Sequence, residues 1–279
     1  MRPVAPALEP WLARWRLQPD GEAFVTEWGS RLAPVLFRGK PAMLKLAAHP
    51  EEQRSARVME WWEGDGAAAV YARQGPALLL ERATGRRSLA QMSARGGDDE
   101  AIRILCGAVR RLHRPRPTPA PRTVVRLERW FRALRQEAPR RGGVLLRSLE
   151  AWRALAASPA ETVVLHGDIH HDNVLDFGAR GWLAIDPKGI VGDRGYDYAN
   201  MLCNPSLGEA GKWLAEVGTA ARLSSRLHVV TAKSGLERRR VLLWLLAYTG
   251  LSASWTLQEG DDAGRALRMA ALAEEALDA

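Results

Sequence analysis

Residues 163–187 form the stretch VVLHGDIHHDNVLDFGARGWLAIDP. Three short apolar segments, at 162–165, 174–177 and 182–185, alternate here with loops that carry acids, an asparagine and histidines. Apolar segments of this length, bounded by glycine and polar residues, favour short buried strands over helices. The stretch therefore predicts a strand, a polar loop and a β-hairpin, with the chemically active side chains on the loops.

The expected hairpin brings two oxygen-bearing side chains together. If its turn is regular and centred between positions 179 and 180, Asn173 faces Asp186 across the strands. Asp168 lies five residues before Asn173 and can reach the same space. Carboxylate and amide oxygens held this close suit a magnesium ion that keeps water ligands and binds substrate phosphates. A β-bulge in the hairpin would shift this register.

The same residues match the requirements of phosphoryl transfer. Magnesium neutralises the β- and γ-phosphate oxygens, and a free carboxylate orients the attacking hydroxyl and accepts its proton. Asp168 and Asn173 have the Asp-x4-Asn spacing of a protein-kinase catalytic loop. Asp186 falls where the metal-binding aspartate is needed, although Pro-Lys follows it where protein kinases have Phe-Gly.

The rest of the chain divides into a part with strand patterns and a part with helical patterns. Short apolar runs separated by Gly and Pro predict an antiparallel meander, interrupted by one helix from Pro50 to about Glu63. From Ser88 onward helical patterns dominate. We expect an α+β protein with two lobes: residues 1–83 as a small antiparallel-sheet lobe with one main helix, and residues 84–279 as a mostly helical lobe.

Composition limits the class of protein. The 279 residues are 47% hydrophobic and 26% charged, which is ordinary for a globular chain and argues against disorder. No run of about 18 apolar residues predicts a transmembrane helix, and the N-terminus lacks the apolar core of a secretory signal. Cys106 and Cys203 offer neither a disulfide framework nor a CxxC zinc site, so we expect a cytoplasmic protein without a membrane partner. The net charge of +8 is scattered, and we expect no nucleic-acid partner.

These motifs together resemble the aminoglycoside phosphotransferase family, in which an HGDxHxxN motif is followed by an aspartate on the next strand. The longer segment 165–200 is similar to the streptomycin 6-phosphotransferase and hydroxyurea phosphotransferase subgroup. Further similarity lies in EEQRSARVMEWW (51–62), LLLERA (78–83) and LLWLLAYTGLSASWTL (242–257), so the resemblance covers most of the chain. It implies a protein-kinase-like fold.

The resemblance implies roles for the residues of the central motif. Asp168 corresponds to the catalytic base, and Asn173 and Asp186 correspond to the magnesium ligands. His166 is expected to orient the loop by hydrogen bonding, and His170 is expected to be structural.

Lys45 corresponds to the lysine that holds the α- and β-phosphates of ATP, although a lone strand-end lysine is more often merely solvated. Its partner should be a glutamate on the following helix. Glu52 shares the apolar helix face of Met59 and is the first choice, with Glu51 as the alternative. Both acids also favour the first turn of a helix through its dipole, without any role at the site.

Other nucleotide contacts follow from the resemblance alone. Ser30, in the loop 28–32, is expected to touch phosphate. The segment 77–83 resembles the hinge, whose backbone would bind the adenine edge through the carbonyl of Glu81 and the amide of Ala83.

Residues for the acceptor are expected near the C-terminus. One helical stripe contains Trp244, Tyr248, Leu251 and Trp255. Such a stripe usually faces the core, but the resemblance places acceptor pockets against C-terminal helices, so Trp244 or Trp255 could form a wall. A guanidinium- or amine-bearing acceptor would also need carboxylates, for which the candidates are Asp193, Asp197, Glu259, Asp261 and Asp262. Among these, Asp197 is better explained as an anchor of the loop backbone.

We therefore expect an enzyme that uses ATP and Mg²⁺ to phosphorylate a hydroxyl of a small molecule such as streptomycin or another aminoglycoside, acting as a monomer or homodimer. A kinase of hydroxyurea or of another small metabolite would carry the same motifs. An inactive kinase-like binding module would be expected to lack one of the four residues Lys45, Asp168, Asn173 and Asp186, all of which are present. The sequence leaves open the acceptor, the phosphorylated position and the choice of ATP over GTP.

Overall fold

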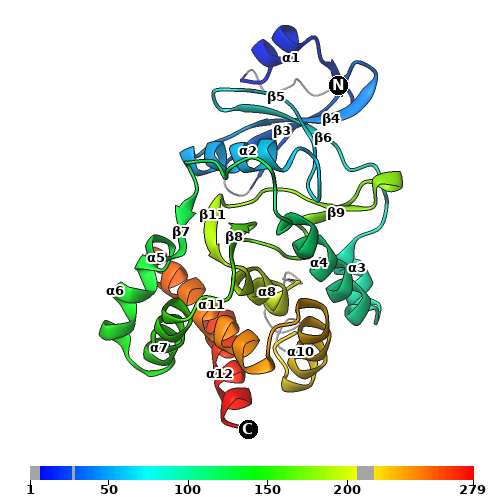
Figure 1. Cartoon of the computed structure of the whole chain (residues 1–279). Coiled ribbons are helices and arrows are strands. Elements are labelled where there is room, and N and C mark those ends of the chain that lie inside the picture. Colours follow the sequence, from blue (N-terminus) through cyan, green and yellow to red (C-terminus); the bar gives the residue numbers. More distant parts are fainter. Residues whose placement is uncertain (1–6, 27–28, 206–216) are drawn as a thin grey trace.

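The structure is a computed structural model that describes residues 7–26, 29–205 and 217–279. An antiparallel sheet with two helices lies at one end of the molecule, and most other helices gather at the opposite end (Figure 1). The elements of the first part are α1 (Glu9–Trp15), β1 (Gln18–Pro19), β2 (Phe24–Val25), β3 (Arg31–Phe37), β4 (Lys40–Leu46), α2 (Pro50–Trp62), β5 (Val70–Gln74) and β6 (Ala77–Glu81). The expected α+β class is confirmed.

The order of the strands differs from the expected meander. The six-stranded sheet has the order β1-β3-β4-β6-β5, with β2 paired to β3. After β4, α2 carries the chain across the sheet to its far edge, where β5 forms. The β5–β6 hairpin then returns β6 to the middle of the sheet, where Leu44 pairs with Leu79. The sequence predicted the strands but not this crossover, because a helix between two strands does not show which edge it leads to.

Helix α2 forms where the sequence supplies both a start and an apolar stripe. Pro50 occupies the first turn together with two glutamates, which suits the positive end of the helix dipole. The helix ends at Glu63, which has the left-handed φ of 50°, followed by Gly64 with φ 79°. Its buried side chains include Ser55, Met59 and Trp62, which share one face at helical spacing.

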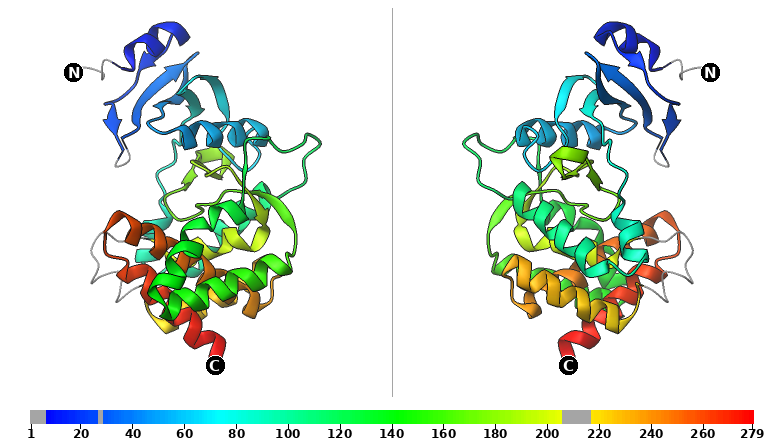
Figure 2. Two further views of the ribbon diagram at one scale, coloured as in Figure 1. Left: turned by 90° about the vertical axis from the view of Figure 1, so that its left-hand side faces the viewer. Right: turned by 90° about the vertical axis from the view of Figure 1, so that its right-hand side faces the viewer.

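The sheet is covered on both faces, and β6 shows how the sides alternate. Leu79 packs into the small core beneath α1, whereas Leu78 and Leu80 pack into the large core that contains the α2 side chains. Helices α1 and α2 accordingly lie on opposite sides of the sheet (Figures 1 and 2). Helix α1 was not expected; its short apolar stretch lies between two prolines and gives a weak periodic signal.

The second part of the chain adds two small sheets to its helices. β7 (Val125–Arg126), β11 (Ile190–Asp193) and β8 (Thr162–Leu165) form one sheet, and β9 (Val174–Asp176) and β10 (Trp182–Ala184) form a hairpin. The helices are α3 (Leu89–Ala94), α4 (Asp98–Leu112), α5 (Leu127–Trp130), α6 (Arg132–Arg141), α7 (Gly143–Ala157), α8 (Asp197–Asn200), α10 (Ala220–Ser234), α11 (Arg238–Glu259) and α12 (Gly264–Asp278). Short 3-10 turns occur at Gly178–Arg180, Arg194–Tyr196 and Met201–Cys203.

The large core continues from the sheet end into the helical end. Trp62 of α2 stacks on His166 with ring centroids 6.3 Å apart, and the Ala68 amide donates to the Ala184 carbonyl at 2.9 Å. Strand β6 ends at Glu81 and the next helix begins at Leu89. A division into two lobes near residue 83 remains a prediction.

Helix α11 lies among the other helices, in contact with α6, α7, α8, α10 and α12. Its Trp244 is 1% exposed and sits in an aromatic cluster with Phe131, Trp152 and Tyr196. Phe131 and Trp152 stack with centroids 4.1 Å apart. Among the residues that the structure covers, no helix is both long enough and apolar enough to span a membrane.

Replacing Trp244 by alanine should lower the free energy of unfolding by about 3–5 kcal/mol, because it removes a fully buried ring from a closely packed cluster. Urea denaturation measures the change. Leu146→Ala on α7 is the control, because that side chain is 40% exposed and its loss leaves no cavity. Equal losses in the two variants would contradict the central position of Trp244.

Candidate active site

A single helical turn, α8, holds the loop that follows β8. Asp197 is 1% exposed and accepts hydrogen bonds from the amides of His166 at 2.8 Å and Gly167 at 2.7 Å. His113, directly after α4, lies 2.8 Å from the same carboxylate through its Nε2. Asp197 thus anchors the loop backbone, as its place in the sequence predicted, and it is not available to an acceptor.

Gly167 is required by this arrangement. Its φ is 83°, and a Cβ at this position would lie 2.7 Å from the side chain of Ile190. Any larger residue would push the loop away from β11.

The Asp168 carboxylate is held from two sides. Asn200, three residues after Asp197 on the same face of α8, donates to its Oδ1 at 2.8 Å. The Lys188 ammonium lies 3.0 Å from its Oδ2. Burial alone would raise the pKa of Asp168, but Lys188 and His170 beside it hold that pKa below its usual value. Asp168 is therefore an ionised carboxylate with a fixed direction.

His166 orients the same loop from within. Its side chain is fully buried, its Nε2 lies 2.7 Å from the Ile185 carbonyl, and its Nδ1 accepts from the Asp168 amide at 3.2 Å. Burial lowers the pKa of His166, so the ring stays neutral and can accept at Nδ1. His170 similarly accepts from the Asp172 amide at 3.3 Å through its Nδ1.

The register of the hairpin differs by one residue from the expected one. Val174 pairs with Ala184, and the Ile185 amide donates to the Asn173 carbonyl at 2.9 Å, so Asn173 faces Ile185 instead of Asp186. The turn contains a 3-10 segment, which places its centre one half-residue earlier than a regular turn would. Asp186 follows directly with the left-handed φ of 55°, which bends the chain away from the strand.

The donor set at the open end of the hairpin fits a magnesium ion. The Asn173 amide nitrogen donates to the Asp168 carbonyl at 2.8 Å, which fixes the side chain and leaves its oxygen with no hydrogen-bond donor among the described residues. Asp186 supplies a carboxylate one residue beyond the partner of Asn173. No cluster of three or more His, Cys, Asp or Glu side chains suited to a metal occurs in the described part of the chain. Two protein oxygens suit Mg²⁺, which keeps waters and takes the remaining ligands from phosphates.

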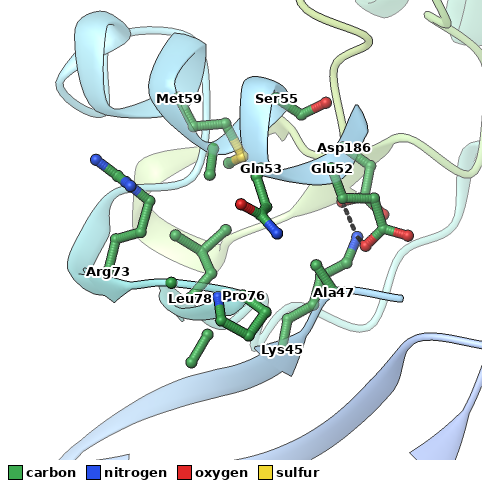
Figure 3. Close-up of a pocket in the computed structure, with 13 residues that line it drawn as sticks. Lys45, Ala47, Glu52, Gln53, Ser55, Met59, Arg73, Pro76, Leu78 and Asp186 are labelled. Atoms are coloured by element: carbon green, nitrogen blue, oxygen red, sulfur yellow. Dashed lines mark hydrogen bonds and ion pairs between the residues drawn. The ribbon is translucent and has the colours of Figure 1, made fainter. Parts of the chain in front are cut away.

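Lys45 connects the sheet to this segment (Figure 3). Its Nζ lies 2.6 Å from Asp186 Oδ1 and 3.2 Å from Glu52 Oε2. The structure thus pairs Lys45 with Glu52, while the alternative, Glu51, is an exposed residue that pairs with Arg54 at 3.0 Å. The cavity beside this group measures about 10 Å³, the room of about one water molecule, and is too small for a purine.

Ser30 has a different contact from the expected one. It is 1% exposed, its hydroxyl lies 2.6 Å from Glu52 Oε1, and it accepts from the Ala48 amide at 3.0 Å. Its only proton is directed to Glu52 in this structure, and the contact of Ser30 with phosphate remains a prediction. Ser30 instead positions the acid that pairs with Lys45. The first residue of the predicted loop, Trp28, lies outside the described residues.

The two predicted hinge residues lie where β6 leaves the sheet. The Glu81 side chain pairs with Arg180 of the hairpin turn and accepts from the Ala69 amide at 3.1 Å. Ala83 packs partly buried on the large core. The prediction used their backbone groups, and adenine binding there remains a prediction.

Asp168 and Lys188 also line a large cleft of about 1190 Å³. Of the acceptor candidates named from the sequence, Trp255 and Glu259 line it near the end of α11. Trp255 meets Trp130 edge to face with centroids 5.3 Å apart. Cationic side chains outnumber acidic ones in its wall: Arg54, Arg122, Arg126, Arg129, Arg132 and Lys188 against Glu51, Asp168 and Glu259.

The acceptor candidates Asp193 and Trp244 do not line this cleft. Asp193 is 5% exposed, pairs with Arg240 and accepts from the Ala160 and Gly195 amides at 2.7 Å each, so it is a buried structural acid. Trp244 belongs to the aromatic core described above. The further candidates at 261 and 262 are exposed beyond α11 and do not line the cleft.

Comparison with known proteins agrees with this geometry. Residues 14–260 match the sequence profile of the family described as aminoglycoside/hydroxyurea antibiotic resistance kinase. The chain belongs to this family. It is 47% identical over 249 residues to a streptomycin 3''-kinase of Klebsiella pneumoniae, covering 89% of this chain and 92% of that protein. It is 33% identical over 260 residues to a streptomycin 6-kinase of Streptomyces griseus, covering 88% and 81%.

The fold also matches solved structures. A ternary complex of an aminoglycoside phosphotransferase with ADP and hygromycin B superposes with a TM-score of 0.64, at 14% identity and over 97% of this chain and 98% of that chain. The expected protein-kinase-like fold is confirmed.

Two side chains of the site were not assigned a role from the sequence. Lys188 follows Asp186 by two residues, in the Pro-Lys that departs from the protein-kinase pattern, and this departure was the available signal. Asn200 follows Asp197 by three residues, so a helix over this segment would have placed both on one face.

The free energy of unfolding should decrease as the pH is lowered from 6.5 to 5, because buried neutral histidines oppose protonation. Burial, aided by Arg226, lowers the pKa of His171 to about 3, and neither ring nitrogen has a partner among the described residues. Below pH 6.5 the unfolded chain binds a proton that folded His171 refuses, which costs about 1.4 kcal/mol per pH unit. Urea unfolding at several pH values gives the free energy of unfolding as a function of pH. Its decrease per pH unit should be smaller for His171→Leu than for the wild type, and the pH dependence that remains is assigned to His166.

The exposed His228 provides the control, and His228→Leu should leave the pH slope as in the wild type. A slope unchanged by His171→Leu would contradict the buried neutral state of His171.

Proposed function

We propose that this protein transfers the γ-phosphate of ATP, with Mg²⁺, to a hydroxyl group of streptomycin, acting in the cytoplasm where ATP is available. The observation that carries the proposal is the ionised Asp168 carboxylate, which Asn200 fixes and which lines a large cleft. The Lys45–Asp186 pair connects the sheet to the same region of the chain. Family membership and two relatives named as streptomycin kinases support the same acceptor.

The residues of the chain divide the reaction between them. Asp168 aligns the acceptor hydroxyl and takes its proton as the oxygen attacks the γ-phosphorus. Asp186 and Asn173 would hold Mg²⁺, which neutralises phosphate charge when bound. Lys45, kept in place by Glu52, would hold the phosphates nearer the nucleoside. Alignment and electrostatic stabilisation supply most of the rate.

The 3''-hydroxyl is the proposed position of transfer. The relative named as a 3''-kinase is more similar to this chain than the 6-kinase quoted above, at 47% against 33% identity. The wall formed by Trp255 and Trp130 offers apolar faces to a sugar ring.

The basic lining of the cleft favours a second candidate. Because cationic side chains outnumber acids there, a guanidinium-bearing drug gains little from the overall charge of the cleft. A small neutral acceptor such as hydroxyurea avoids this repulsion, and the family description includes hydroxyurea.

Incubation of the purified protein with Mg-ATP and streptomycin should yield ADP and a monophosphorylated drug whose phosphorus–proton couplings place the phosphate on the 3''-oxygen. Hydroxyurea and other aminoglycosides form the comparison panel. Phosphate on the 6-oxygen would contradict the proposed position, and transfer only to hydroxyurea would replace the proposed acceptor.

Asp168→Asn should lower kcat by about 10²–10⁴-fold, because the amide cannot accept the hydroxyl proton. The matched control is Asp172→Asn, an exposed acid of the same loop, which should retain wild-type turnover. Steady-state kinetics and Mg-ATP affinity measure the two effects, and nucleotide affinity should be retained in both variants. Near-wild-type turnover by Asp168→Asn would remove the proposed base.

A further inference from the structure

Lys188 is the cation nearest to the reacting side of the site. Its Nζ lies 3.0 Å from Asp168 Oδ2, and its side chain is 42% exposed in the large cleft. Its backbone is fixed, because its amide donates to the His166 carbonyl at 2.7 Å. A fixed backbone with a partly exposed side chain allows the ammonium to move while its origin stays in place.

The present position of the ammonium conflicts with proton acceptance by Asp168. Asn200 occupies Oδ1, so Oδ2 is the oxygen left for an acceptor hydroxyl, and Lys188 is bonded to it. For the hydroxyl to approach, the ammonium has to move to another anion. The γ-phosphate would bring such an anion to the space between Asp168 and Asp186.

Lys45 cannot take over this task. Its side chain is 9% exposed and is engaged by two acids, Glu52 and Asp186, on the sheet side of the site. Lys188 lies in the loop between Asp186 and β11 and lines the acceptor cleft. The two lysines therefore border different cavities, Lys45 the small one beside Glu52 and Lys188 the acceptor cleft.

We propose that Lys188 binds the phosphoryl group as it is transferred, exchanging its contact with Asp168 for a non-bridging oxygen of the γ-phosphate. This inference rests on the proposed phosphotransfer and adds a catalytic residue to it. The acceptor oxygen forms its bond to the γ-phosphorus, the bond from phosphorus to the β,γ-bridging oxygen breaks, and ADP leaves with that electron pair. The hydroxyl proton goes to Asp168, and Lys188 keeps its own protons throughout.

The test compares nucleotides that differ in the γ-phosphate. Lys188→Met keeps the length of the side chain without its charge, Lys188→Arg keeps the charge, and Lys40→Met changes an exposed lysine far along the sheet as the control. Calorimetry with Mg²⁺ gives the affinities for ADP and for the non-hydrolysable analogue AMP-PNP. Lys188→Met should bind ADP like the wild type and AMP-PNP at least about tenfold more weakly, because one charged hydrogen bond is lost.

Kinetics provide the second readout. Lys188→Met should lower kcat by about 10²–10³-fold and raise the KM for ATP by about tenfold, in line with the weaker AMP-PNP binding, while the KM for streptomycin changes little. Lys188→Arg should retain a substantial part of both kcat and AMP-PNP affinity, and Lys40→Met should match the wild type. Where Lys188→Met lowers the melting temperature, the same two affinities measured on Lys188→Gln decide the question.

Equal weakening of ADP and AMP-PNP would overturn the inference, because Lys188 would then only shape the nucleotide site. A raised KM for streptomycin with unchanged kcat would also overturn it and assign Lys188 to acceptor binding. The nucleotide comparison does not depend on the acceptor, so wild-type protein that binds both nucleotides but phosphorylates no aminoglycoside would contradict the proposed function alone.

Discussion

The active loop depends on one buried carboxylate. Asp197 is almost fully removed from solvent. It accepts hydrogen bonds from two backbone amides and lies against a histidine, so groups from two other segments balance its charge. A buried acid without such partners would destabilise the fold, which means that loop and helix form together. The same short helix directs Asn200 at Asp168, and the site is therefore set before any ligand arrives.

The charges of the site compensate one another across the fold. Lys45 of the sheet faces Asp186 of the hairpin end, and Lys188 faces Asp168 on the acceptor side. These two pairs use the same carboxylates that the proposed reaction assigns to a metal ion and an acceptor hydroxyl. In that proposal ligand binding is an exchange of partners, in which new charges replace existing ones without leaving buried charges uncompensated. The cleft-wall arginines at positions 122, 126, 129 and 132 are exposed, and their effect on an acceptor is screened by solvent.

Much of the catalytic side followed from spacing along the chain. Asp168 and its neighbours lie within one short segment whose local geometry is restricted, and the helix periodicity after Pro50 selected Glu52 over Glu51. The acceptor side did not follow in the same way. Trp244 and Trp255 share one helical stripe, yet the middle of α11 is surrounded by other helices while its end reaches the cleft. Helical periodicity predicts which residues share one face of a helix, but it does not predict which part of the protein that face contacts.

The sequence by itself determined the α+β class, the catalytic loop and the pairing of a strand lysine with a helix acid, because each depends on residues a few positions apart. Only the tertiary structure decided that Asp193 is a buried ion-pair partner, that Asn173 faces Ile185 and that Lys188 reaches the carboxylate of Asp168. These contacts join residues through a turn of irregular geometry or between separate segments of the chain. Their distances depend on how the elements pack, and packing is a property of the whole chain.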